Sequence, residues 1–487
     1  MLLCVLLARV EARAADPRRW LEERITKLSA DARIAPARVG VLVQDVASGR
    51  TLVKLRETEQ FNVASCAKLV TTAAALWALG PEYRFKTLLY ADPQRDERTS
   101  KRKKNRPAGT LEGNLYLKGF GSPVLDERDL WQLVDDLKDR GIRAIGGALV
   151  IDESYFDGQR LAPLYETRNT DAWYRPPNGA LSIAYNVVSV HVFAGDAPGQ
   201  PARIVLRPRS SYLKLVNKVA TVSRGRRSWV QVRTRARGGR AEVEVTGRVR
   251  LGYKRRRPFR RRIDDPGLLA GHALLDILAR RAVAVGQRRV LRGKVPDKAQ
   301  ALAWHYSEPL AVVARLMNKH SNNFIAEQVA KTLGAEVIGP PATWGKGLKV
   351  VGRHLKSLSI TSGSYTMKNG SGLYDASAFS PAQLVQILRG SYLAFRTGAD
   401  YVASLAQAGV DGTLQHRYVG SGAERYVRAK TGTLARVVTL AGYAGAAVNR
   451  GPLVFAILLN DLPEGRVRQA REVADEMAAA MVTFLER

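Results

Sequence analysis

The pattern of apolar and polar positions predicts strands at both ends of the chain. Residues 39–46 and 51–54 are strand-like and flank a glycine-containing turn, which predicts a β-hairpin. Near the end, residues 436–443 and 452–459 are again strand-like, and a helical pattern follows from 464 to 486. An early hairpin, two late strands and a closing helix can share one sheet, so we expect one domain built from both chain ends.

The middle of the chain has a different pattern. A segment rich in Ala and Leu begins near Ser65 and stops at Gly80-Pro81, and helical periodicity returns after Pro309. Between residues 89 and 304 the pattern changes to short alternating strands separated by Gly and Pro turns. We therefore predict an α/β fold of the α+β type, with a mostly antiparallel sheet flanked by helices and with inserted β-rich domains.

The chain length supports this division. With 487 residues, the chain exceeds what one hydrophobic core usually holds. We expect a signal peptide in 1–14, the first part of a catalytic domain in 15–88, two β-rich inserted domains in 89–304, and the second part of the catalytic domain in 305–487. The sequence contains no apolar run of about 18 residues, which argues against a membrane-spanning enzyme.

The first residues are typical of a cleaved secretory signal. A short apolar stretch, 2–8, precedes Ala12-Arg13-Ala14, which fits the small-residue rule for signal peptidase. A frayed terminal helix is the alternative interpretation. We expect an exported protein, periplasmic or associated with the cell envelope. Cys66 is then the one cysteine of the mature chain, so that chain can form no internal disulfide.

The net charge of +33 is distributed unevenly. Residues 224–262 hold sixteen Lys and Arg against two Glu, a net charge of +14, and residues 95–106 add a net +5. Strand-like alternation in 230–237 and 241–245, with Gly238-Gly239 between them, predicts a hairpin with an arginine-rich face. Such a face attracts polyanions: nucleic acid, anionic lipid headgroups or acidic wall polymers. A merely solvated basic face remains the alternative.

The first motif that carries chemistry is Ser65-Cys-Ala-Lys68, whose spacing places a hydroxyl and an amine on the same helix face. The same Ser-x-x-Lys pattern recurs by chance at 100–103 and 211–214. Ser65 differs in its context, because it opens an apolar helix. There a buried lysine can lose its proton and the helix N-terminus favours developing negative charge. A surface Ser and Lys without function is the alternative.

Two further motifs follow, Ser321-Asn322-Asn323 and Lys430-Thr431-Gly432-Thr433, and each alone is more often structural than catalytic. Together with the first motif they supply every group that acyl transfer needs. In this hypothesis Ser65 is the nucleophile, Lys68 its base in the neutral form, Ser321 the proton relay to the leaving amine, Asn323 the amide that holds the substrate backbone, and Lys430 the cation for a terminal carboxylate.

The third motif also provides backbone contacts for a substrate, from Thr431, Gly432 and Thr433. Gly432 allows the strand to approach a substrate closely. The backbone N–H groups of Ser65 and Thr433 are the expected oxyanion donors.

This set of motifs resembles that of the penicillin-recognising serine enzymes. The interval of 256 residues from Ser65 to Ser321 is similar to that of one branch, the class C low-molecular-mass penicillin-binding proteins of the DacB-like D-alanyl-D-alanine carboxypeptidase/endopeptidase family. Segments 113–125, 369–381 and 409–417 also resemble this family, although Asn369 and Ser122 stand where it has aspartates and Tyr374-Asp375 replaces its usual Ser-Arg.

The resemblance implies a penicillin-binding transpeptidase/β-lactamase-like catalytic domain and a serine hydrolase of peptidoglycan. It implies an acyl-enzyme on Ser65, peptide stems as substrate, inhibition by β-lactams, and no cofactor. Whether the enzyme trims terminal D-alanine, cuts cross-links or does both stays open, as does its oligomeric state.

Three alternative functions are less consistent with the sequence. A β-lactamase would need a glutamate-activated water, and no Glu-Pro-x-Leu-Asn-like loop occurs between Asn323 and Lys430. A nucleic-acid-binding protein is suggested by charge alone, but no recognisable module supports it, so we expect no specific nucleic acid. A wall-binding protein without catalysis is disfavoured because every reactive residue is present. The six histidines show no metal-ligand spacing, so we predict no metal site.

Overall fold

The computed structural model describes residues 16–93, 108–168, 170–255, 257–447 and 450–487. The predicted signal peptide, the basic segment 95–106 and the chance motif at 100–103 lie outside these ranges. The chain forms two compact units. Unit 1 comprises Met1–Phe61, Ser380–Val385 and Ala406–Arg487, and unit 2 comprises Asn62–Phe379 and Gln386–Leu405. The domain boundaries expected at 89 and 304 stay a prediction.

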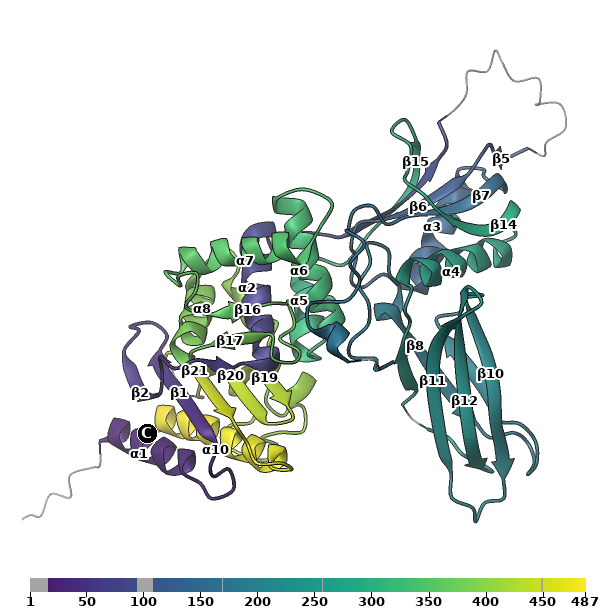
Figure 1. Ribbon diagram of the computed structural model, residues 1–487. Coiled ribbons are helices and arrows are strands. Elements are labelled where there is room, and N and C mark those ends of the chain that lie inside the picture. Colours follow the sequence, from purple (N-terminus) through teal and green to yellow (C-terminus); the bar gives the residue numbers. More distant parts are fainter. Residues whose placement is uncertain (1–15, 94–107, 169, 256, 448–449) are drawn as a thin grey trace, which may run out of the picture. The chain divides into compact units, whose positions relative to one another are not determined.

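Unit 1 is organised around an antiparallel six-stranded sheet with the order β18-β19-β20-β21-β1-β2 (Figure 1). Its strands are β1 (Arg38–Asp45), β2 (Thr51–Leu55), β18 (Ala406–Gln407), β19 (Val427–Leu434), β20 (Val437–Ala444) and β21 (Leu453–Asn460). The early hairpin and the two late strands therefore share one sheet, as predicted. Strand β1 pairs directly with β21, so the two chain ends meet in the middle of the sheet.

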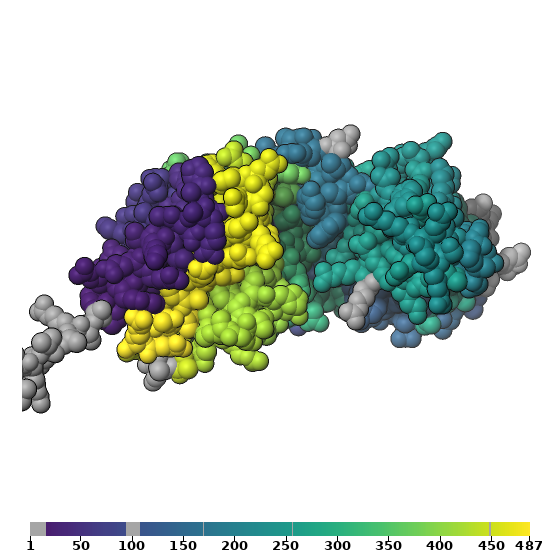
Figure 2. Space-filling model, turned by 90° about the horizontal axis from the view of Figure 1, so that it is seen from below, coloured from purple at the N-terminus to yellow at the C-terminus, as the bar shows by residue number. Residues whose placement is uncertain are grey.

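Two helices pack against one another beside this sheet, α1 (Pro17–Ser29) and α10 (Val467–Glu486). The buried residues of α10 recur every three or four positions, which is why this helix can lie flat on the sheet. All residues of β20 and β21 are buried, as expected for central strands. On the surface, the N-terminal segment lies directly beside the C-terminal helix (Figure 2).

The helical part of unit 2 contains the first two motifs. A 3₁₀ turn (Ala64–Cys66) leads into α2 (Ala67–Leu79), which ends at Gly80 with a φ of 85°. The periodic segment after Pro309 is two helices rather than one, α5 (Leu310–Lys319) and α6 (Asn323–Val337). Two further helices of unit 2 are α7 (Trp344–Ser357) and α9 (Gly398–Ala403). Helix α8 (Pro381–Leu393) and strand β3 (Phe61–Asn62) each cross a boundary between the two units. Strands β16 (Thr366–Met367) and β17 (Ser377–Phe379) are short.

The middle part of unit 2, residues 86–306, begins with a mixed sheet of order β14-β7-β6-β4-β15, with β5 beside β7. The strands are β4 (Lys86–Ala91), β5 (Thr110–Leu111), β6 (Leu115–Gly119), β7 (Ala144–Asp152), β14 (Ala284–Arg292) and β15 (Gln300–Tyr306). Helices α3 (Glu127–Asp139) and α4 (Pro266–Arg280) belong to this part and were not predicted from the sequence. Their start signals were present: a capping box at Asp126 and Asp129, and an N-cap Asp265 before Pro266.

Two further sheets in this middle part have three strands each, β13-β8-β9 and β10-β12-β11. Their strands are β8 (Val187–Phe193), β9 (Arg203–Arg207), β10 (Leu213–Val222), β11 (Trp229–Arg237), β12 (Arg240–Arg250) and β13 (Phe259–Arg262). The predicted arginine-rich hairpin is confirmed, because β11 and β12 pair antiparallel. Gly238 and Gly239 form its turn with φ of 57° and 72°, values that favour glycine.

No helix in the described part of the chain is long and apolar enough to cross a membrane.

Candidate active site

Ser65 lies in the 3₁₀ turn immediately before α2, and its side chain is half-buried. Lys68 follows in the first turn of α2 and is fully buried. Its Nζ lies 3.0 Å from Ser65 Oγ. The predicted pairing of hydroxyl and amine on one face of the helix start is therefore present, with the helix N-terminus beside the hydroxyl.

Two oxygens from distant segments complete the surroundings of the Lys68 amine. Nζ lies 2.7 Å from Asn323 Oδ1 and 2.8 Å from the carbonyl oxygen of Ser371. A neutral amine has two N–H donors and one lone pair. If the donors bind Asn323 and Ser371, the lone pair faces the Ser65 hydroxyl. This geometry suits a base that takes the Ser65 proton.

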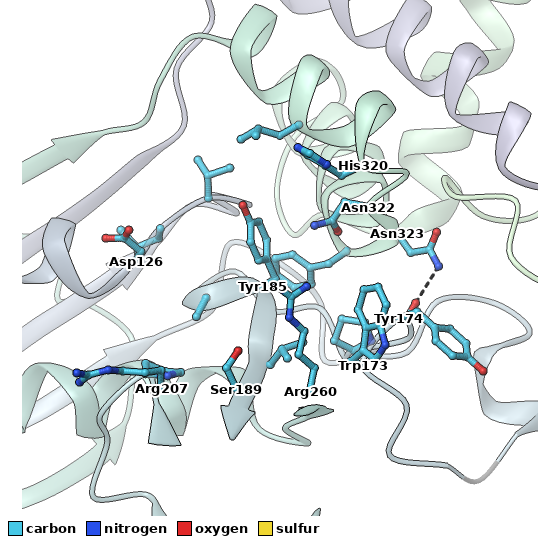
Figure 3. Close-up of a pocket in the computed structure, with 18 of the residues that line it drawn as sticks. Asp126, Trp173, Tyr174, Tyr185, Ser189, Arg207, Arg260, His320, Asn322 and Asn323 are labelled. Atoms are coloured by element: carbon cyan, nitrogen blue, oxygen red, sulfur yellow. Dashed lines mark hydrogen bonds between the residues drawn. The ribbon is translucent and has the colours of Figure 1, made fainter. Parts of the chain in front are cut away.

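Asn323 is the first residue of α6 and connects two parts of unit 2. Its Oδ1 accepts from Lys68, and its Nδ2 donates to the carbonyl oxygen of Tyr174 at 2.8 Å (Figure 3). The helix starts there because Asn322 caps it, accepting from the N–H of Ile325. Ser321 precedes this cap with a φ of 53°, which breaks the helical path between α5 and α6. Ser321 and Asn323 line the same pocket.

Sequence reasoning missed Glu327, which lies one turn after Asn323 and is fully buried. Its carboxylate accepts from the N–H groups of Gly370 and Ser371 at 2.9 Å each, and from Trp344 Nε1 at 2.8 Å. Glu327 thereby holds the segment whose carbonyl binds Lys68. Burial raises the pKa of Glu327, while these hydrogen bonds oppose the increase, as Lys68 does when its amine is protonated. An acid inside an apolar helix was the available signal.

Asn369, one of the departures from the family pattern, is also buried in this network. Its Oδ1 accepts from the N–H of Gly372 at 2.9 Å, which an aspartate could also do. Its Nδ2 donates to the carbonyl oxygen of Pro163 at 3.0 Å, which an ionised aspartate could not do. The asparagine thus suits its local partners in this chain.

The third motif lies on β19, in unit 1. Lys430 is fully buried, and its Nζ donates to the carbonyl oxygen of Thr431 at 2.6 Å. Thr431 Oγ1 donates to Thr413 Oγ1 at 2.9 Å. Gly432 is buried in the sheet opposite Thr439 of β20, and the exposed Thr433 accepts from Arg471 at 3.2 Å.

The structure therefore brings three predicted residues into direct contact within unit 2: Ser65, Lys68 and Asn323. Ser321 precedes Asn323 by two residues. The four residues from Lys430 to Thr433 lie together on strand β19 of unit 1. Across the described ranges, no group of three or more His, Cys, Asp or Glu residues could hold a metal ion.

A serine hydroxyl beside a lysine amine at a helix start is the arrangement that one class of proteins, the serine acyl-transfer enzymes, can use. Comparison with known families is more specific: the model of the D-Ala-D-Ala carboxypeptidase 3 (S13) family matches residues 21–484. The chain belongs to this family, and the membership predicted from the motifs is confirmed.

Individual relatives agree with this membership. The chain is 31% identical over 453 residues to a D-alanyl-D-alanine carboxypeptidase of Actinomadura sp. (strain R39), covering 90% of this chain and 81% of the relative. It is 25% identical to the D-alanyl-D-alanine carboxypeptidase DacB of Haemophilus influenzae over 411 residues, which is 83% of this chain and 82% of the relative.

Among solved structures, penicillin binding protein 4 (dacB) of Haemophilus influenzae is similar, with a TM-score of 0.75 and 23% identity over 93% of this chain and 97% of that one. This likeness confirms the predicted fold class, a mixed α/β fold of the penicillin-binding type with antiparallel sheets and helices.

Proposed function

We propose that this serine-type D-Ala-D-Ala carboxypeptidase cleaves peptidoglycan stem peptides through an acyl-enzyme on Ser65. The observation that carries the proposal is the 3.0 Å contact between Lys68 Nζ and Ser65 Oγ, with the oxygens of Asn323 and Ser371 also within hydrogen-bond distance of the amine. Family membership supports the substrate class, and the named activities of the relatives point the same way.

The proposed reaction has two steps. Ser65 Oγ attacks the carbonyl carbon of the penultimate D-alanine as its proton moves to Lys68, and a tetrahedral intermediate forms. The C–N bond then breaks, the leaving amine takes a proton through Ser321, and the acyl group stays on Ser65 as an ester. A water molecule, deprotonated by the same route, hydrolyses the ester and restores the Ser65 hydroxyl.

The remaining motif residues have binding roles in this proposal. Asn323 holds the amide of the acyl chain, and Lys430 binds the terminal carboxylate as a cation. The threonines and Gly432 on β19 bind the substrate backbone. The N–H groups of Ser65 and Thr433 stabilise the negative oxygen of the intermediate.

A β-lactam would acylate Ser65 in the same way, since its amide is attacked like the peptide bond. The Haemophilus influenzae protein has been solved in complex with a β-lactam.

We also propose that the present protein is exported to the periplasm or cell envelope, because its substrate lies outside the cytoplasm. We propose in addition that residues 89–304 are an insertion in the catalytic domain.

Digestion of purified muropeptides tests the proposed function. We expect loss of terminal D-alanine from monomeric stems, detected by product mass, and we expect benzylpenicillin to inhibit it. A purified, folded protein that leaves every D-alanyl-D-alanine stem intact would contradict the proposal.

Removing the proposed proton relay gives a specific prediction. Ser321→Ala should reduce turnover of a D-alanyl-D-alanine peptide by about a hundredfold, because the leaving amine loses its positioned proton donor. Steady-state kinetics with a short peptide measures the effect. Ser364→Ala, an exposed serine in unit 2, is the matched control and should keep wild-type turnover. Undiminished turnover in Ser321→Ala would show that the Ser-x-Asn match is accidental.

We propose, as a separate role, that the arginine-rich face within 224–262 binds an anionic envelope polymer. Its cations are only partly neutralised: Arg235 and Arg237 pair with Glu242, at 2.7 and 3.8 Å, and Glu244 pairs at 2.7 Å with Lys218 of the neighbouring strand β10. Arg233 and Arg237 on β11 and Arg248 on β12 are exposed. Positive charge that no acidic side chain neutralises raises the local concentration of polyanions at the sheet face.

The test replaces Arg233, Arg237 and Arg248 by glutamine and keeps Arg235, which holds Glu242. We expect weaker binding to intact sacculi at low salt, because exposed charges act over about 8 Å at physiological ionic strength. High salt should weaken wild-type binding in the same way. The control removes three exposed cations from α1 by Arg18→Gln, Arg19→Gln and Lys27→Gln. Equal binding by the two triple variants would refute the role.

A further inference from the structure

The turn that joins α8 to α9 carries large apolar side chains exposed to solvent. Leu393 is 51% exposed, and Phe395 is fully exposed, at 104%. Trp77, near the end of α2, is 44% exposed. One exposed apolar residue is ordinary, but a group of large ones marks a surface that binds a partner or a membrane.

Contacts of Arg396 place this turn at the end of α2. Arg396 follows Phe395 directly, and its guanidinium pairs with Glu82 at 3.1 Å. The same guanidinium lies close to Gly80, the residue that ends α2, because a Cβ at Gly80 would be 2.5 Å from Arg396 Nη2. Trp77 precedes Gly80 by three residues, about one helical turn. The Trp77 ring and the apolar turn therefore lie at the same end of α2.

Helix α7 presents a row of cations to solvent. Lys349, Arg353 and Lys356 are spaced four and three residues apart, which places them on one face of the helix, and all three are exposed. The helix has no acidic residue, and none of the three cations pairs with an acid elsewhere in the described ranges. This cationic row is therefore not neutralised by neighbouring side chains.

The cationic row adjoins both parts of the apolar group. His354, in the same helix, packs against the Trp77 ring, with ring centres 5.3 Å apart. At the end of α7, the carbonyl oxygen of Leu358 accepts from Gln386 Nε2 on α8. Leu358 also packs on Gly390, where a Cβ would be 2.6 Å from its Cδ2. Helix α7 thereby connects the end of α2 with the end of α8 (Figure 1).

Acidic side chains do not offset the positive charge of this region. Residues 344–400 contain seven Lys and Arg against two Asp, a net charge of +5. Glu82, beside the turn, is paired with Arg396. Cations around exposed apolar side chains are complementary to an anionic surface that has an apolar interior.

This combination suits a phospholipid bilayer better than a groove on another protein. A protein partner covers an apolar side chain by close packing around it, usually within a packed patch. Phe395 has its whole surface exposed, so no wall of this chain surrounds it. A protruding ring can enter a fluid acyl layer without a shaped pocket, while Lys and Arg side chains bind phosphates at the headgroup level. Tryptophan is enriched at the boundary between the two layers, a position that suits Trp77.

We infer that this end of unit 2 docks on an anionic phospholipid membrane. Leu393 and Phe395 enter the acyl layer, Trp77 lies at its boundary, and the cationic row of α7 binds the lipid phosphates. We call Trp77, Leu393, Phe395 and the cationic row the docking face. The inference is separate from acyl transfer, and it differs from the arginine-rich face within 224–262 in its residues and in its partner.

Docking through this face leaves the nucleophile accessible. Trp77 follows Ser65 by twelve residues, so the rise of about 1.5 Å per residue puts about 18 Å between them along the helix axis. Ser65 is at the beginning of this helical segment and the docking face is at its end. Variants of the docking face should therefore keep wild-type acylation by benzylpenicillin.

Sedimentation with vesicles tests the inference. The purified full chain is mixed at low salt with vesicles of phosphatidylcholine alone, or of phosphatidylcholine and phosphatidylglycerol in equal amounts. We expect the wild type to sediment with the anionic vesicles only. Leu393→Ser/Phe395→Ser and, separately, Lys349→Gln/Arg353→Gln/Lys356→Gln should each lower the partition coefficient about tenfold or more.

A second measurement reports insertion itself. Vesicles with brominated acyl chains quench tryptophans that enter the lipid, and we expect this quenching to be lost in Trp77→Phe. Unit 1 offers matched controls, an exposed apolar residue and three exposed cations of α1. Val419→Ser and the triple variant Arg18→Gln/Arg19→Gln/Lys27→Gln should keep wild-type partitioning.

Thermal unfolding shows whether each variant is folded. Wild-type partitioning by the folded Leu393→Ser/Phe395→Ser variant would overturn the inference, because adsorption would then depend on charge alone. A wild type that leaves the anionic vesicles unbound would overturn it too. So would a dimer in solution, detected by light scattering, that this double variant abolishes, since a second copy would then cover the face.

Discussion

Ser65→Ala should abolish the covalent adduct that benzylpenicillin forms with this protein. The adduct needs a nucleophilic oxygen next to a base, and Ser65 Oγ is the hydroxyl that lies 3.0 Å from the Lys68 amine. Intact-mass analysis of the wild type should show one added penicillin, and peptide mapping should place it on the Ser65 peptide. Peptidase turnover should fall with it, by about a thousandfold or more.

The chain offers a matched control for this variant. Ser211 is three residues before Lys214, the same pattern by chance, and Ser211→Ala should keep both the adduct and the turnover. The Ser211 hydroxyl instead contacts His272 Nδ1 at 3.2 Å. A penicillin adduct that survives Ser65→Ala would refute the assignment of the nucleophile.

Lys68→Arg should also prevent acylation, although it keeps the positive charge. An arginine side chain stays protonated at every accessible pH, so it cannot take the Ser65 proton. We expect the rate at which benzylpenicillin acylates Ser65 to fall about a thousandfold or more. Intact-mass analysis of samples quenched at successive times measures this rate. Lys214→Arg, in the chance motif, should leave the rate unchanged.

Because Lys68 is fully buried, a larger side chain could also disturb packing. Lys68→Met is therefore a second variant, with a similar volume and no charge. Thermal unfolding reports whether each variant is folded. Acylation at the wild-type rate by either folded variant would show that Lys68 is not the base.

The amino-acid sequence by itself determined the elements whose signals are local. The hairpin of β1 and β2, the arginine-rich hairpin and the helix after Ser65 follow from alternation, glycine turns and apolar periodicity within a few residues. The pairing of Ser65 with Lys68 was also predictable, because residues three apart on a helix necessarily face the same side. Helices α3 and α4 were missed although their capping residues were visible.

Only the tertiary structure decided how distant groups combine. Lys68 and Asn323 are 255 positions apart, yet their side chains lie 2.7 Å from each other. No local pattern indicated that Glu327 would hold the segment bearing the Ser371 carbonyl. Ser189 likewise lies between Arg207 and Arg260 in its sheet only because β9 and β13 pair with the two edges of β8. Periodicity acts between neighbours along the chain, whereas the surroundings of an amine or an anion depend on packing between segments that share no sequence signal.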